Sequence, residues 1–427
     1  MSAAPARYQA VRAAVVILLL AVAALPVSAR EQAPARATIT QQLQALIEAH
    51  PEVGDLLTQS IAAAAKANPD PETNPVQTLP EYYAFIDESS KLIPRQIVAN
   101  PPDRIRDQIL QLICYFYFLV DQPLDALKDK GLYKNAIQYA PPFSGWLRDF
   151  TINWGQFLNT RASWDQATYQ QFLADPSFGL MRDWYEPPTR WTTFNEFFAR
   201  YLRDPSERPI AAPNDPRVVT SPADSVPQGV WPIDEQSRIK VQGGLGVKLA
   251  RFFTIPQLLG PDSAYADAFA GGVLTHTFLN VNDYHRYHFP VGGTVKEADQ
   301  IQQNVALEVT WDDNTRRYDP VDSTGWQFSQ TRGVVIVDTG DTGLVALIPM
   351  GMAMVSSVQF EDDVTVGSSH AKGDMLGNFL FGGSDFVIVF QKQVGFELTA
   401  PKDDTGDGGY AHLLMGEAYG KMTGDRQ

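Results

Sequence analysis

The sequence has a single cysteine among 427 residues and is poor in positive charge. Cys114 stands within an apolar run from Leu110 to Phe118. An internal disulfide is therefore excluded, and a packed core cysteine is preferred over a catalytic thiol. Lysine and arginine total 34 against 49 acidic residues, a net charge of −15 at pH 7. Such a chain is not expected to bind nucleic acid, because little would neutralise the phosphates.

Long apolar runs are also scarce. The run from Ala13 to Leu25 would span about 20 Å as a helix, short of the ~30 Å hydrocarbon core of a membrane. Arg7 and Arg12 precede this run, and the small-residue pattern Val27-Ser28-Ala29 follows it. This order is typical of a secretory signal peptide. We expect residues 1–29 to be removed on export to the periplasm or outside the cell; an uncleaved membrane anchor is the alternative.

Residues 30–190 are predicted to form a helical N-terminal domain. Apolar residues recur there at spacings of three and four, and proline-rich breaks separate the segments. The predicted helices cover Ile39–Ala49, Leu56–Ala67, Tyr82–Leu92 and Ile105–Val120. A further aromatic helical group runs through Trp146, Phe150, Trp154 and Phe157. Core packing is preferred over a ligand pocket for these aromatic side chains.

Residues 191–427 are predicted to form a mostly antiparallel β-rich domain. Short β-branched runs punctuated by glycine and proline indicate strands with frequent turns. The runs are Val218-Val219, Gly293–Val295, Ala306–Val309, Gly333–Val337 and Leu344–Ile348. The expected fold class is therefore α+β, with a helical domain followed by the β-rich domain.

Histidine and serine offer the main candidates for chemistry. Of six histidines, His285 and His288 stand close together in one motif, and Ser384 follows a Gly-Gly pair just before an apolar strand. A histidine has a pKa suited to removing a proton from a hydroxyl at neutral pH. The pattern suggests a serine that attacks its own backbone. A metal-dependent hydrolase using both histidines is an alternative, although no four-ligand set supports a metal site.

The order of the motifs is more specific than any one of them. They are Phe194-Asn195-x-Phe197-Phe198-x-Arg200, Arg208-Pro209-Ile210, Ser221-Pro222-Ala223-Asp224, Asp283-Tyr284-His285-Arg286-x-His288-x-Pro290, Ile348–Val358, Lys372–Gly377, Gly382-Gly383-Ser384 and Met415-Gly416-Glu417. In this order the chain, from about residue 194 to its end, resembles the phosphatidylserine decarboxylase family, whose members are self-processing, pyruvoyl-dependent carboxy-lyases. Residues 30–190 are similar to the helical extension of larger members.

The resemblance implies a zymogen that cleaves itself between Gly383 and Ser384. By this resemblance His288 takes the proton of Ser384, and Asp224 holds His288 in the needed tautomer. Ser384 then attacks the Gly383 carbonyl, and cleavage leaves a β chain and an α chain of residues 384–427. The former Ser384 becomes the covalent pyruvoyl cofactor, and no metal is implied.

The resemblance also implies decarboxylation of an amine-bearing substrate through a Schiff base. His285 is implied to reprotonate the carbanion or to position the departing carboxylate. The substrate is either phosphatidylserine, converted to phosphatidylethanolamine, or a free amino acid, converted to its amine. The helical extension and the acidity of the chain favour a soluble substrate. Membrane contact and a homodimer are left open.

One residue departs from the family pattern. Asp385 follows the serine where the resemblance leads us to expect threonine or serine. Its carboxylate could oppose anionic intermediates, attract a cationic amine, or point to solvent on the opposite face of the strand. We expect the last, because adjacent strand residues point to opposite faces. A non-processing relative that binds an amine ligand without turnover is the alternative function.

Overall fold

The computed structural model describes residues 38–94, 105–240, 252–321, 325–351, 358–381, 384–403 and 407–424. The predicted signal peptide, residues 1–29, lies outside the described residues, as do Gly382 and Gly383 of the predicted cleavage site. Residues Ile39–Gln427 form one compact unit. No helix in the described ranges is long and apolar enough to cross a membrane.

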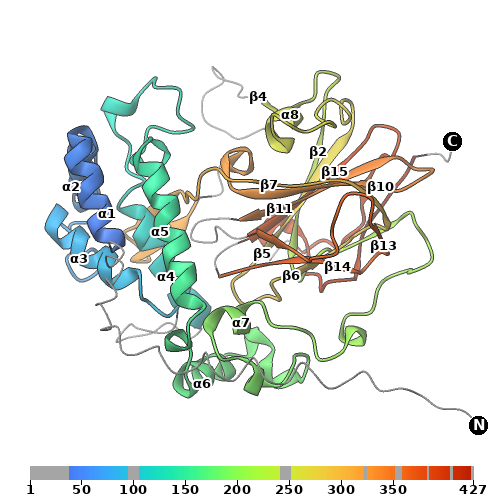
Figure 1. Cartoon of the computed structure of the whole chain (residues 1–427), viewed down its shortest axis with the longest axis horizontal. Coiled ribbons are helices and arrows are strands. Elements are labelled where there is room, and N and C mark those ends of the chain that lie inside the picture. The colour runs from blue at the N-terminus through green and yellow to red at the C-terminus, as the bar shows by residue number, and fades with distance from the viewer. Residues whose placement is uncertain are drawn as a thin grey trace, which may run out of the picture. The chain divides into compact units, whose positions relative to one another are not determined.

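The first half of this unit is helical, as predicted. Its helices are α1 (Ile39–Ala49), α2 (Pro51–Ala67), α3 (Leu79–Ser89), α4 (Ile105–Phe118), α5 (Phe143–Leu158) and α6 (Gln166–Ala174). In Figure 1 the helices α1 to α5 lie together at one side of the β-strands. The predicted bounds of α1 are confirmed. Helix α2 begins earlier than predicted, because Pro51 stands in its first turn, where proline suits the start of a helix.

The aromatic group predicted to pack in the core lies on α5. Trp146, Phe150 and Trp154 are buried, and the half-buried Phe157 packs against the same core. Cys114 on α4 is completely buried, and its burial raises the pKa of the thiol to about 12. Both predictions of core packing are therefore confirmed.

The second half is built on a seven-stranded antiparallel sheet, as the α+β prediction requires. The strand order is β13-β7-β10-β11-β15-β5-β2. The bounds are β2 (Val226–Pro232), β5 (Val273–Leu279), β7 (Gly293–Ile301), β10 (Arg332–Asp338), β11 (Leu344–Gly351), β13 (Ser369–His370) and β15 (Ser384–Phe390). Strand β15 is central, paired with β11 on one side and β5 on the other.

Smaller sheets complete the β region. One has the order β12-β14-β6, with β6 (Arg286–His288), β12 (Val358–Phe360) and β14 (Met375–Phe379). Another has the order β1-β17-β16, with β1 (Val218–Thr220), β16 (Glu397–Leu398) and β17 (Ala418–Lys421). Two pairs are β3 (Arg238–Lys240) with β4 (Phe252–Thr254) and β8 (Val309–Asp312) with β9 (Arg317–Pro320). The short helices are α7 (Phe194–Phe198) and α8 (Ile255–Leu259).

The central strand β15 is buried on both faces. Phe386 and Ile388 belong to a core shared with the smaller sheets. Val387 and Val389 belong to a second core, which includes residues of α8. Because side chains alternate along a strand, Ser384 shares the face of Phe386, and Asp385 shares the face of Val387. Both faces of the sheet at β15 are therefore closed to solvent.

The helices and the β region share a hydrophobic core. Tyr318 of β9 donates a hydrogen bond to the carbonyl of Thr73 and accepts one from Asn68. Ala306–Glu308 was predicted to begin a strand, and this prediction is wrong: β8 begins at Val309. The amide of Leu307 instead donates to the side chain of Gln138 in the helical half. A side chain thus replaces the strand partner that the sequence pattern suggested.

Candidate functional site

Ser384 is the first residue of β15, and its backbone is fixed on both sides. It pairs with Gly351 of β11 and with Leu279 of β5. The side chain is completely buried, and its Oγ has no hydrogen-bond partner among the described residues. A buried hydroxyl without a partner costs about 1 to 3 kcal/mol. Each such atom in a native structure calls for an explanation, such as a catalytic role or a bound water or ion.

His285 carries a second buried atom of this kind. Its Nδ1 lies 2.9 Å from the carbonyl oxygen of Asp283, so Nδ1 holds the proton and Nε2 has the free lone pair. Nε2 is buried without a partner in the described part of the chain. Burial and the nearby charge of Arg200 lower the pKa of His285 to about 3. The imidazole is therefore neutral at pH 7.

His285 lies beside the end of β14, the strand that precedes Ser384 in the chain. The carbonyl of His285 accepts a hydrogen bond from the amide of Phe379, the last residue of β14, at 2.9 Å. The ring of Phe198 lies 3.9 Å from the ring of His285 and 5.3 Å from that of Phe381. Residues 380–383 join β14 to β15, and Ser384 is the first residue of β15. Strand pairing and aromatic packing thus place His285 beside Phe379 and close to Phe381, shortly before Ser384 in the chain.

His288 lies on β6, and both of its ring nitrogens have contacts. Nδ1 lies 2.9 Å from the carbonyl of Gly373, so it donates there, and Nε2 accepts from the Tyr284 hydroxyl at 3.2 Å. Gly373 has a φ of 91°, and a Cβ on it would lie 2.5 Å from Ile210. Only glycine can bring this carbonyl to the histidine without strain.

Burial dominates the electrostatics of His288 and lowers its pKa to about 4. The charge of Asp224 acts in the other direction and raises it. Asp224 therefore influences His288 through its charge. The direct hydrogen bond that the resemblance implies is not among the contacts that the structure gives to the described side chains.

The carboxylate of Asp224 is instead bound by Arg208. Arg208 Nε lies 3.0 Å from Oδ1, and Nη2 lies 2.7 Å from Oδ2. The amide of Met415 donates to Oδ1 at 2.8 Å. Both side chains of the pair are buried, and Arg208 also stacks on Trp184 at 4.3 Å. The motifs around residues 208, 224 and 415 thus meet at one carboxylate.

Asp385 is completely buried, so the expectation that it points to solvent is wrong. It does lie on the opposite face of the strand from Ser384, as predicted. That face is covered by a hydrophobic layer that includes Trp326 and Trp231. Within this layer Asp385 Oδ2 lies 2.8 Å from Nδ1 of His276.

Sequence reasoning gave no role to three residues at or near the site. Arg208 was noted only as part of a motif. His276 lies on β5 between two threonines and was counted only as one of the six histidines. His412 lies beyond any motif, yet its Nε2 is 2.9 Å from Oδ1 of Asp283 in the histidine motif. Hydrogen bonding to Asp283 raises the pKa of His412 against the opposing effect of burial. Only tertiary contacts could reveal these partnerships.

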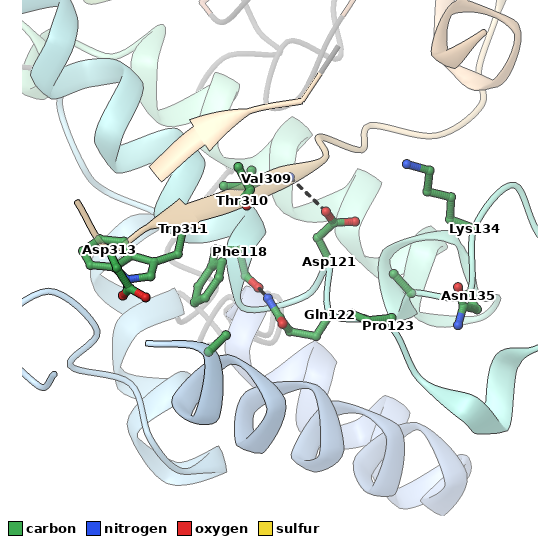
Figure 2. A pocket seen from close by; sticks show the side chains of 12 residues that line it. Phe118, Asp121, Gln122, Pro123, Lys134, Asn135, Val309, Thr310, Trp311 and Asp313 are labelled. Carbon is green, nitrogen blue, oxygen red and sulfur yellow. Dashed lines mark hydrogen bonds between the residues drawn. The ribbon is translucent and has the colours of Figure 1, made fainter. Parts of the chain in front are cut away.

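A pocket of about 370 Å³ lies elsewhere, between the end of α2, the segment after α4 and strand β8. None of the predicted site residues lines it. Figure 2 shows the carboxylate of Asp121 within this pocket, accepting a hydrogen bond from the amide of Val309. Burial raises the pKa of Asp121 to about 7. This contact attaches β8 to the helical half and is separate from the candidate site.

No cluster of three or more histidine, cysteine, aspartate or glutamate side chains suited to a metal occurs within the described ranges. The residues of the candidate site do fit a cofactor that is formed from the chain itself. Ser384 Oγ, which has no partner within the described ranges, is the hydroxyl of the residue from which such a cofactor would form.

Comparisons with known proteins agree with this arrangement. The chain is 35% identical over 208 residues to a phosphatidylserine decarboxylase proenzyme 2 of Oryza sativa, covering 48% of this chain and 30% of that protein. It is 29% identical over 293 residues to the decarboxylase iboD of Amanita muscaria, covering 62% and 80%. A phosphatidylserine decarboxylase proenzyme of Pseudomonas fluorescens is 25% identical over 270 residues, covering 59% and 85%.

The chain spans about a third of the length of the rice relative and most of the length of the other two. A profile of the phosphatidylserine decarboxylase family matches residues 194–421, which is more than half of the chain and contains Asp224, both motif histidines and Ser384. The protein belongs to the phosphatidylserine decarboxylase family.

Proposed function

We propose that the protein is a carboxy-lyase that matures by cleaving its own chain between Gly383 and Ser384. The observation that carries this proposal is the buried Oγ of Ser384, which starts a central strand and has no hydrogen-bond partner in the described part of the chain. The printed names of the rice and Pseudomonas relatives, which describe proenzymes, support it.

In the proposed maturation, Ser384 Oγ attacks the carbonyl carbon of Gly383 and gives its proton to His288. The amide bond breaks, the nitrogen gains a proton, and an ester joins Gly383 to the serine oxygen. Removal of the Cα proton of residue 384 then expels Gly383 as a carboxylate and leaves a double bond between Cα and Cβ. Uptake of one water and release of one ammonia convert the new chain end into a ketone.

In this proposal His288 accepts the serine proton. The Gly373 carbonyl holds the proton on Nδ1, and the low pKa keeps the ring neutral, so Nε2 is basic. Nε2 must exchange the Tyr284 hydroxyl for Ser384 Oγ. The charge of Asp224 favours the imidazolium that forms, and Arg208 holds that carboxylate in place.

The pyruvoyl group, once formed, supplies a carbonyl that holds the substrate amine and accepts the electron pair left when carbon dioxide departs. His285 is the proposed proton donor for the second half of the reaction, or the group that positions the carboxylate. It is neutral in the precursor because it is buried beside Arg200. An arriving substrate carboxylate raises the pKa of a neighbouring histidine, so substrate binding would itself help His285 take up the proton.

We propose a primary amine with an adjacent carboxylate as the substrate class. Phosphatidylserine and a free amino acid share this chemistry. The names of the rice and Pseudomonas relatives point to the lipid, whereas the Amanita relative, which is matched over most of its length, is named only as a decarboxylase. We also propose export, on the strength of the signal-like pattern in residues 1–29.

Release of carbon dioxide tests this function. The purified wild-type protein and S384A are supplied with vesicles containing phosphatidylserine, with free serine and with an aromatic amino acid. The expected result is release from one substrate by the wild type and none by S384A. Absence of release from all three, together with an uncleaved wild-type chain, would instead support the second candidate, an amine-binding relative without turnover.

A further inference from the structure

The residue that follows the nucleophile carries a buried charge. Asp385 is completely buried, and its carboxylate has contacts with three groups. His276 Nδ1 lies 2.8 Å from Oδ2, the side-chain amide of Gln327 lies 3.4 Å from the same oxygen, and the amide of Phe386 donates to Oδ1 at 2.8 Å. Only the histidine among these partners can carry a positive charge.

His276 is held in position from several sides. It lies on β5, directly beside β15, where it pairs with Val387. Its ring stacks on Trp231, with centroids 4.9 Å apart and planes 24° apart. Tyr419 donates a hydrogen bond to its backbone carbonyl at 3.2 Å. An imidazolium is stabilised both by an aromatic face and by a buried carboxylate. The surroundings of His276 therefore suit its charged form.

The position of Asp385 matters because of where negative charge develops. This inference rests on the proposed self-cleavage. When the Cα proton of residue 384 is removed, negative charge spreads onto the carbonyl oxygen of residue 384. That carbonyl is bonded to the amide nitrogen of Asp385, so a bare carboxylate would lie one peptide unit away. Two like charges so close in a buried site repel each other strongly.

We propose that His276 is a positioning residue for self-cleavage, which neutralises the carboxylate of Asp385 on the face of β15 opposite Ser384. The pair allows a charged residue to follow the nucleophile without opposing the anion formed during maturation. His276 acts through Asp385 and does not touch the reacting atoms. The pair also accounts for the survival of a carboxylate at a completely buried position, since buried charges are normally paired.

Rates of self-cleavage in four variants test this proposal. H276Q leaves the carboxylate without its counter-charge and is expected to slow cleavage about 10- to 100-fold. D385N removes the charge but keeps the shape, and it is expected to cleave at least as fast as the wild type. The double variant H276Q/D385N is expected to recover most of the lost rate. H370Q is the matched control, because His370 also stacks on an aromatic ring, that of Phe289, but lies on β13 at the edge of the sheet.

The outcomes distinguish a failure of the role proposed for His276 from a failure of the proposed function. The role of His276 in charge neutralisation would be overturned if H276Q cleaved at the wild-type rate. It would also be overturned if the double variant were as slow as H276Q. Loss of cleavage in D385N would show that the carboxylate itself is required, and would also overturn it. The result for D385N does not depend on whether H276Q folds. Thermal unfolding would report whether H276Q is folded. A wild-type chain that stays intact would remove the proposed function, and with it this inference.

Discussion

Arg208 binds both oxygens of Asp224, at 3.0 and 2.7 Å, and both side chains are buried. The two residues come from separate motifs, and Met415 from a third motif adds its amide to the same carboxylate. Asp224 is therefore held in place before any chemistry begins, and its charge is available to His288. The arrangement makes Arg208 a necessary support for the site although it carries no reaction step.

Substitution of Arg208 by alanine should destabilise the protein and stop maturation. Removing one partner of a buried ion pair leaves an uncompensated charge and costs about 3 to 5 kcal/mol. Urea unfolding of each substitution in the S384A background, where every chain should stay intact, measures this change in the free energy of unfolding. R203A is the control, because Arg203 forms ion pairs with Asp183 and Glu207 at the surface, and such pairs contribute about 1 kcal/mol or less. Equal effects of the two substitutions would contradict the role of Arg208.

His288 and His285 should act in different steps, self-cleavage and decarboxylation respectively. H288A is expected to leave the chain uncleaved, because it removes the proposed base for Ser384. H285A is expected to cleave but to lose about 100-fold or more in decarboxylation, since a positioned acid or base contributes about 100- to 10,000-fold. Denaturing gels and carbon dioxide release measure the two steps. H50A, at an exposed position before α2, is the control. An uncleaved H285A with a cleaved H288A would reverse the assignment.

The stability contributed by His288 should depend on pH. Burial lowers its pKa in the folded protein to about 4, from an ordinary value of 6.5. Between these values the unfolded chain takes up a proton that the folded protein does not, so the contribution is complete above pH 6.5 and is lost as the pH falls towards 4. The difference in unfolding free energy between S384A and S384A/H288Q, both expected to remain single chains, should therefore shift by about 2 to 3 kcal/mol across this window.

Comparing the two proteins cancels the titration of other groups, among them Asp121, whose raised pKa acts in the opposite direction. Denaturant unfolding at pH 7, 5.5 and 4 provides the measurement. A difference that stays constant with pH would show that His288 is not buried in its neutral form.

The sequence predicted the architecture well and the side-chain contacts less well. Helix α1 and the aromatic core of α5 follow from local periodicity, which depends only on neighbouring residues. The start of β8 was misplaced, because the partner of Leu307 is a glutamine far away in the chain. Three of the motifs do meet in the structure, since Arg208 and the amide of Met415 both bind the carboxylate of Asp224.

The contacts within the site depend on tertiary packing, which motifs do not encode. Asp224 was expected to contact His288 directly, whereas the structure places Arg208 on its carboxylate. Alternation along β15 predicted the face on which Asp385 lies. It could not predict that this face is covered, or that His276 on the neighbouring strand supplies the counter-charge.

Intact mass spectrometry of the purified full-length protein tests the central claim most directly. The account predicts two chains separated between Gly383 and Ser384. The smaller chain, residues 384–427, should be lighter by one ammonia than the product of simple hydrolysis, because its first residue has become a ketone. S384A should remain a single chain. A wild-type protein that also remains a single chain would contradict the account.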